Sequence, residues 1–336
     1  MYKRGTDMKY NTLGGVVVSV LFASACERSA PSPAQDVPAS VQQPAAVVRP
    51  SASAQAPATI DPAAVKAATG LEPEVTDGIV RVAYPRKDVH VEVDGWAMPP
   101  FMGLTSWAGF TPGKLPGVEA MVMGDLVLFE DEISDVMSAA LDAGLKVTAL
   151  HNHFVFDKPH VFFMHIEGEG SVATLGKAVK NALDASVAIR AKSPEPRAGF
   201  GGAALPAKSA IDGTKLESVF NVKGAAKDGM YKITIGRPAT TAACGCQIGK
   251  MMGVNTWAAF AGTDENAVVD GDFAVTEDEL QPVLKSLRGD GINVVAIHHH
   301  MVGETPRILF LHYWGRGTSA ALATSVKKAL GLTKTE

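Results

Sequence analysis

Two stretches of the sequence follow the same pattern: VTALHNHFVFDKPHVFFMHIEGEG at 147–170 and VVAIHHHMVGETPRILFLHYWGRG at 294–317. Each copy holds an apolar run, a His-x-His, a polar break with one proline, and a second apolar run that ends in histidine before a Gly-x-Gly. Two apolar runs on either side of a turn predict a β-hairpin. The sequence therefore repeats one hairpin together with one arrangement of three histidines.

The repetition extends well beyond the hairpin. MGLTSWAGF at 102–110 matches MGVNTWAAF at 252–260, and GDLVLFEDEI at 124–133 matches GDFAVTEDEL at 271–280. From this last pair onward the offset stays at 147 residues through the Gly-x-Gly. Each copy is of domain size, which is far longer than a solenoid unit.

The expected domain organisation follows from these matches. We expect repeat one at 60–190 and repeat two at 211–332, with a Pro/Gly/Ala-rich linker at 191–210 between them. The alternating apolar periods within each copy predict an initial short helix, strands, a helix, the hairpin and a closing helix. The acidic residues that begin the middle helix suit its dipole.

This element order predicts an α+β fold. Its last part reads β-α-β-β-α, which is typical of an antiparallel sheet with helices on one face. Two tandem homologous repeats of this kind are expected to pack about a pseudo-two-fold axis, sharing either a sheet or a helix layer.

The N-terminal sequence is typical of a secretion signal. Residues 1–25 combine basic residues with a short apolar run that ends in small residues before Cys26, as in a lipoprotein-type signal peptide. Residues 26–59 are rich in Ala, Pro and Ser and predict a disordered tether. We expect lipidation of Cys26 and a membrane anchor in the cell envelope, in the periplasm or at the cell surface; the alternative is a cleaved signal peptide and an ordinary Cys26 thiol.

The net charge of the chain bears on which partners to expect. The chain has 336 residues, of which 46% are hydrophobic, and its formal net charge is −4. This mild acidity gives no electrostatic reason to expect a nucleic acid partner, so function must be argued from sites.

The histidines are the main site candidates. With the hairpin turn centred at 157–159, His151 is expected opposite His165, with His153 on the same face. The equivalent set is His298, His300 and His312. Three neutral imidazoles can bind a divalent ion and leave a fourth position open, with Zn²⁺ the first choice and Cu, Mn or Fe also compatible. The alternative is a set of histidines that only pack the sheet.

Carboxylates are weaker catalytic candidates. Asp125 and Asp272 each follow a glycine at the expected end of an apolar strand, where they would be turn residues or acceptors for imidazole N–H groups. Glu167 could act as a general base in repeat one only, because Trp314 stands at its position in repeat two.

One cysteine pair occurs in repeat two alone. Cys244 and Cys246 could form a disulfide, remain as two thiols, or bind copper, and their spacing leaves all three open.

These motifs carry a family resemblance. MVMGDLVLFEDEI, VTALHNH, PHVFFMH, GVNTWAAF, VTEDELQPVL and VVAIHHHM resemble the LppY/LpqO-type bacterial lipoproteins, over nearly all of 60–332. The resemblance implies an envelope location and a duplicated domain of unknown function.

Two functional hypotheses follow. The first is an envelope lipoprotein whose paired three-histidine clusters bind a metal, for hydrolysis or for metal handling. The second is a non-catalytic binding or scaffold lipoprotein for a small-molecule or envelope ligand. No nucleophile–histidine pattern, P-loop or dinucleotide fingerprint stands out in the sequence.

Overall fold

The computed structural model describes residues 59–335, which belong to one compact unit. The predicted signal peptide at 1–25, Cys26 and the tether up to residue 58 lie outside the described residues. Among the helices at 59–335, none has both the length and the hydrophobicity needed to cross a membrane.

Repeat one contains three α-helices and nine strands. In chain order these elements are α1 (Pro62–Thr69), β1 (Pro73–Thr76), β2 (Ile79–Pro85), β3 (Glu92–Val93), β4 (Trp96–Ala97), η1 (Pro100–Met102), β5 (Thr105–Pro112), β6 (Ala120–Phe129), α2 (Ile133–Asp142), β7 (Lys146–Asn152), β8 (Asp157–Lys158), β9 (Val161–Gly170) and α3 (Val172–Lys192).

Repeat two follows the same order with a different short hairpin. Its elements are α4 (Gly213–Phe220), β10 (Ala225–Lys227), β11 (Met230–Gly236), β12 (Thr240–Thr241), β13 (Gln247–Ile248), η2 (Lys250–Met252), β14 (Asn255–Gly262), β15 (Ala267–Val275), α5 (Glu277–Gly289), β16 (Asn293–His298), β17 (Leu309–Gly317) and α6 (Ser319–Leu330).

One twelve-stranded sheet runs through both repeats. Its order is β1-β2-β5-β6-β9-β7-β16-β17-β15-β14-β11-β10, so each of the six strands that repeat one contributes has its counterpart in mirrored position in repeat two. The short strands β3, β4 and β8 form a separate three-stranded sheet. The central pair, β7 and β16, is antiparallel and joins Leu150 to Ile297. This order confirms the expected tandem α+β arrangement and identifies the shared layer as the sheet.

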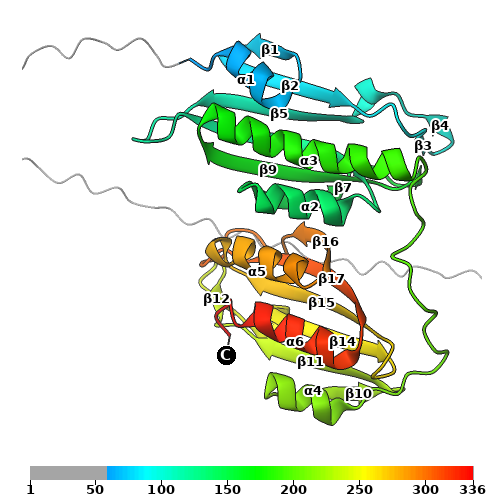
Figure 1. Ribbon diagram of the computed structural model, residues 1–336. Coiled ribbons are helices and arrows are strands. Elements are labelled where there is room, and N and C mark those ends of the chain that lie inside the picture. The colour runs from blue at the N-terminus through cyan, green and yellow to red at the C-terminus, as the bar shows by residue number, and fades with distance from the viewer. Residues whose placement is uncertain (1–58, 336) are drawn as a thin grey trace, which may run out of the picture. The chain divides into compact units, whose positions relative to one another are not determined.

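The helices cover one face of this sheet. Figure 1 shows α2 and α3 in front of the strands of repeat one, and α5 and α6 in front of those of repeat two. The predicted apolar stripe of α2 is fully buried in the core; its residues are Ile133, Val136, Met137, Ala140 and Leu141. On the strands, alternate residues such as Leu126 and Leu150 point into the same core. The residues between them face the other, helix-free side.

Local signals for the helix ends agree with the structure. Asp61 caps α1 through the backbone N–H of Ala63, and a proline begins that helix. A capping box joins Thr276 and Glu279 at the start of α5, as the sequence predicts. The closing helix α3 continues to Lys192, well past the apolar pattern at 171–184 that predicts it.

The predicted hairpin register is wrong by two residues. His165 lies opposite Ala149, and His151 lies opposite Phe163. The reason is that the connection is longer than a tight turn: Asp157 and Lys158 leave this sheet and pair with β3 instead. A register shift between Val147 and Ala149 adds to the difference.

A buried ion pair stabilises the start of the middle helix in each repeat, α2 in repeat one and α5 in repeat two. In repeat one, Arg86 donates two hydrogen bonds of 2.8 Å to Glu132, and both side chains are almost fully buried. Burial alone would lower the pKa of Arg86, but its hydrogen bonds to Glu132 and Asp88 raise that pKa above its ordinary value. In repeat two, Arg237 donates to Glu279 at 2.7 Å.

Candidate metal site

All six candidate histidines lie around the middle of the helix-free face. His151, His165, His298 and His312 belong to the four central strands and are half-buried. His153 follows β7 directly, His300 lies two residues beyond the end of β16, and both are more exposed. Because side chains alternate along a strand, the neighbouring Leu150 and Met164 point to the helices instead.

In repeat one, two imidazoles meet directly. The Nε2 atoms of His151 and His165 are 2.9 Å apart, so one ring donates a hydrogen bond to the other. Two nitrogens bound to one tetrahedral zinc ion lie about 3.3 Å apart, which is close to this spacing. His153 stacks on Phe163 at 3.3 Å between ring centroids, and its own centroid is 5.2 Å from that of His151.

In repeat two, the carboxylate of Asp272 lies beside the histidine rings. The ligand atoms of Asp272, His298 and His300 all lie within 4.8 Å of one another. The Nε2 atom of His300 is 3.6 Å from a carboxylate oxygen of Asp272. His312 completes the cluster, with its ring centroid 4.8 Å from that of His298.

Several buried polar atoms in this area have no hydrogen-bond partner within residues 59–335. They are Nε2 of His298 and one carboxylate oxygen each of Asp272 and Asp125. A buried polar atom without a partner costs free energy, so such atoms normally have a ligand, a water or an ion beside them. Their position beside the rings fits a bound cation.

The electrostatics of repeat two also fit a cation. Burial raises the pKa of Asp272 to about 6, while the nearby His312 acts in the opposite direction. Burial, followed by the neighbouring ring of His312, lowers the pKa values of His298 and His300. In repeat one, burial likewise lowers the pKa of His153. The lowered pKa values favour the neutral imidazoles that ligate metals, whereas the raised pKa of Asp272 means that its carboxylate is mostly ionised only above about pH 6.

The position of the two aspartates corrects one sequence interpretation. Asp125 and Asp272 are not turn residues, because each lies within a long strand of the sheet. Asp125 lies directly opposite His165 on the neighbouring strand, and Asp272 lies opposite His312. The apolar run around Asp125 is continuous and shows no alternation, so the sequence does not indicate which face of the sheet carries this residue.

Glu167 lies two residues beyond His165 on β9, so it shares the helix-free face. Its carboxylate forms an ion pair of 3.1 Å with Lys146. At the equivalent position of repeat two, Trp314 is half-buried. The charge of Glu167 is therefore directed at a lysine of the neighbouring strand.

Two tryptophans flank the clusters. Trp107 lies opposite Asp125, and Trp257 lies opposite Asp272, on equivalent strands of the two repeats. Arg81 stacks over the Trp107 ring at 4.7 Å, and the Lys232 ammonium lies 3.8 Å from the centroid of Trp257. These equivalent positions agree with the duplication.

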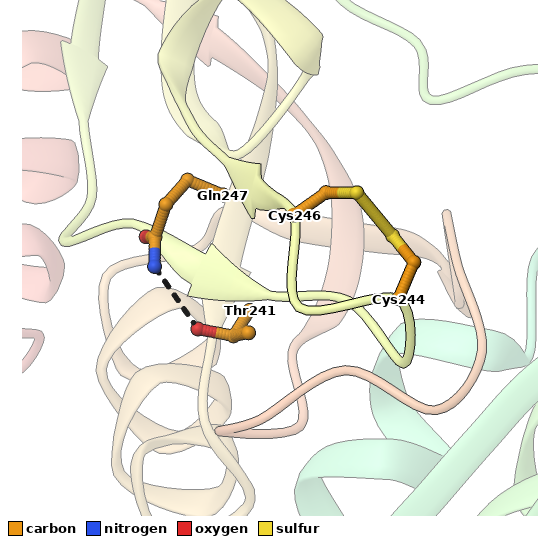
Figure 2. The surroundings of a disulfide bond; sticks show 4 residues. All are labelled: Thr241, Cys244, Cys246 and Gln247. Carbon is orange, nitrogen blue, oxygen red and sulfur yellow. Dashed lines mark hydrogen bonds between the residues drawn. A yellow bond between two sulfur atoms is a disulfide. The ribbon is translucent and has the colours of Figure 1, made fainter.

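Cys244 and Cys246 form a disulfide. Figure 2 shows the bond at the tip of the β12–β13 hairpin, where a hydrogen bond from Gln247 to Thr241 also joins the two strands. Both cysteines are exposed. Of the three alternatives that the spacing leaves open, the structure has the disulfide.

Comparison with known proteins gives one clear match. The family model described as Domain of Unknown Function (DUF1259) matches residues 63–185 and again 214–332, which together make up most of the chain. No curated protein matches the sequence.

Solved structures give only weak likenesses. A trimeric bacterial microcompartment shell protein, PduB, is 13% identical, with 77% of this chain and 89% of that chain covered and a TM-score of 0.18. The double-ringed trimeric shell protein MSM0271 from the RMM microcompartment is 13% identical, with 64% and 82% covered and a TM-score of 0.17. TM-scores this low support no argument about fold or function.

Proposed function

Because the chain belongs to the family of the Domain of Unknown Function (DUF1259) and carries that domain twice, we propose a function from its own residues. The two histidine clusters bind divalent transition-metal ions, with Zn²⁺ the first choice. The single observation that carries the proposal is the group Asp272, His298 and His300, whose ligand atoms lie within 4.8 Å of one another. Imidazole and carboxylate together are a usual ligand set for such ions.

The unpartnered atoms support this proposal over purely structural histidines. A histidine that only packs a sheet normally has both ring nitrogens hydrogen-bonded or exposed to water. Nε2 of His298 is buried, and no group in the described part of the chain forms a hydrogen bond with it. A cation at this point would satisfy that nitrogen and the unpartnered oxygen of Asp272 together.

The ions would keep an open coordination position. The helix-free face carries the clusters, and His153 and His300 are exposed at its surface. An ion bound by three protein atoms there can hold a water or a ligand molecule as its fourth partner. Hydrolysis through metal-bound water and metal handling both start from this arrangement.

The proposed location is the cell envelope. The signal peptide at 1–25, the small residues before Cys26, the polar tether and the resemblance to LppY/LpqO-type lipoproteins all support a lipid anchor. Mass spectrometry of the membrane fraction should find the mature chain starting at a lipidated Cys26. An unmodified Cys26 thiol in that fraction would contradict the anchor.

Elemental analysis tests the metal proposal. The full chain, purified without an affinity histidine tag, should hold about two metal equivalents. His151→Ala and His298→Ala should each leave about one equivalent, and the double variant none. His90→Ala is the matched control, because His90 is exposed and lies outside both clusters, and it should leave the metal content unchanged.

A wild-type chain that binds no divalent metal would end the proposal. The alternative would then be the non-catalytic binding or scaffold protein with structural histidines. The stacking of His153 on Phe163 and of His300 on Phe310 shows how the rings could pack in that case.

A further inference from the structure

One residue of repeat one has a backbone conformation that its side chain disfavours. Phe156 lies in the loop between β7 and β8 with a φ angle of 63°, in the left-handed region. A β-carbon is disfavoured in that region, so glycine normally occupies such positions. At the equivalent position of repeat two, 147 residues later, Gly303 has a φ angle of 74°. The two repeats therefore share the left-handed conformation, but repeat one has an aromatic side chain there.

Packing does not explain this phenylalanine. The residue is 74% exposed, so burial of its ring contributes little to stability. Its backbone carbonyl accepts a hydrogen bond of 3.3 Å from the N–H of Asp94, and a glycine would accept the same bond. A strained residue that the fold does not need is typical of a functional position. The ring of Phe156 is therefore a candidate for ligand binding.

A cavity of about 670 Å³ lies beside this ring. It is lined by the turn between β3 and β4 on one side and by residues between 152 and 160 on the other. Phe154 forms a second aromatic wall, and its ring packs edge-on against Phe163 at 5.9 Å between centroids. The volume is in the usual range for sites that bind small organic molecules.

The charges that line the cavity are mainly negative. Glu92, Asp94 and Asp157 bring carboxylates to it, against the ammonium group of Lys158. Asp157 is buried, and its carboxylate is fixed by a hydrogen bond of 2.7 Å from the backbone N–H of Val161. Carboxylates attract a cation by Coulomb forces, and aromatic faces attract it through their quadrupole. Charge complementarity therefore favours a positively charged ligand.

Repeat two differs at this corner. It has the disulfide hairpin β12–β13 in place of β3 and β4. Ala243 of this hairpin lies 3.6 Å from the point where a β-carbon on Gly303 would be. The equivalent position thus lies next to a closed hairpin, whereas Phe156 borders the cavity.

We propose that the cavity of repeat one binds an organic ammonium cation. The charge of the ligand lies near Glu92 and Asp94, and its alkyl groups lie against the rings of Phe154 and Phe156. Alkylated ammonium groups are the ligands that aromatic walls of this kind recognise. The site goes beyond the proposed metal function and needs no metal ion.

Calorimetry with choline as the probe tests the site. The full chain, treated with a chelator so that the outcome does not depend on metal, should bind one choline. The neutral isostere 3,3-dimethylbutan-1-ol should bind about tenfold more weakly, because it has the same shape without the charge. Equal affinities would overturn the choice of a cation, and no choline binding at millimolar concentrations would overturn the site.

The variant Phe156→Gly separates binding from stability. Glycine is the residue that repeat two has at this position, so the variant should melt no lower than the wild type. Its affinity for choline should fall about fivefold, because one aromatic wall is lost. Phe200→Ala, at an exposed phenylalanine outside the cavity lining, should leave the affinity unchanged. An unchanged affinity in Phe156→Gly would overturn the role of this ring.

A pair of matched aspartates tests the charge. Asp94 and Asp77 each precede a glycine and have a φ angle of 52°, which asparagine also tolerates. Asp94→Asn should lower choline affinity about fivefold and leave binding of the neutral alcohol unchanged. Asp77→Asn lies outside the cavity lining and should match the wild type for both probes. Equal effects of the two variants on choline would overturn the assignment of the cation to this cavity.

Discussion

The two repeats share one scaffold but differ at the histidines. In repeat one, the rings of His151 and His165 hydrogen-bond to each other. In repeat two, the rings surround a buried carboxylate, and Nε2 of His298 has no partner. A cation entering repeat one must break a hydrogen bond, whereas repeat two already presents unpartnered ligand atoms. Duplication therefore preserved the ring positions but left repeat two better organised for a metal.

The buried ion pairs at the start of α2 and α5 also differ between the repeats. In repeat one, Glu132 receives hydrogen bonds from Arg86, and Arg190 lies 3.0 Å from the same carboxylate. In repeat two, Glu279 faces a single arginine, Arg237. Asp88 also pairs with Arg86, and Asp131 also pairs with Arg190. Two guanidinium groups therefore share three carboxylates in repeat one, whereas Arg237 pairs with Glu279 alone among the described residues of repeat two.

The largest expected effect concerns these ion pairs. Glu279→Gln leaves the buried Arg237 without its carboxylate partner, and an unpaired buried charge costs about 3–5 kcal/mol of unfolding free energy. The matched variant Glu132→Gln should cost less, because Asp88 still pairs with Arg86 and Asp131 still pairs with Arg190. Urea unfolding followed by tryptophan fluorescence measures both. Equal losses would show that the additional carboxylates of repeat one contribute nothing.

A pair of equivalent glycines gives the next largest effect. A methyl group on Gly271 would overlap the ring of Tyr313, whose hydroxyl donates to the carbonyl of Trp257. At the equivalent Gly124 the methyl would meet the more yielding Ile166 at 3.1 Å, although the Trp107 carbonyl is also close. Gly271→Ala should therefore cost about 2–3 kcal/mol by overpacking, and Gly124→Ala about 1 kcal/mol. Thermal unfolding would check the order, and a larger loss for Gly124→Ala would contradict it.

The carboxylates should distinguish the two metal sites. Asp272→Asn, made in a His151→Ala background so that only repeat two is measured, should weaken Zn²⁺ binding about 10–100-fold. Asp125→Asn in a His298→Ala background should weaken binding less, because Asp125 does not belong to a close ligand group. Competition with a chelator gives both affinities. The distinction between the repeats would be lost if the two aspartates had equal effects.

Much of this fold could be predicted because the sequence shows the periodicity of its helices and the residues that cap them. The apolar stripe from Ile133 to Leu141 and the capping box of Thr276 follow the helical period, and both are present. The duplication was visible as a nearly constant offset, and it implied two copies about a pseudo-two-fold axis that share either a sheet or a helix layer. These features depend on neighbours along the chain.

The features that could not be predicted depend on contacts between residues far apart in the sequence. The two-residue error in the hairpin register arose because Asp157 pairs with β3, a strand more than 60 residues earlier in the chain. The acids before α2 were interpreted as dipole charge, although Glu132 is the buried partner of Arg86. The place of Asp272 among the rings follows from the pairing of β15 with β17. No local pattern encodes these contacts.

The smallest expected effect concerns the disulfide that repeat two alone carries. Replacing both cysteines, Cys244→Ser with Cys246→Ser, should cost at most about 1.5 kcal/mol, because the bond closes a very short loop. The hairpin also keeps its link to the rest of repeat two through backbone hydrogen bonds between Thr241 and Thr305. Metal content should stay at the wild-type value, since the proposed ligands are histidines and Asp272. Thermal unfolding and elemental analysis measure both quantities, with reductant-treated wild type as the control. Loss of one metal equivalent in the double serine variant would instead make the cysteines part of a metal site and give the two repeats different chemistry.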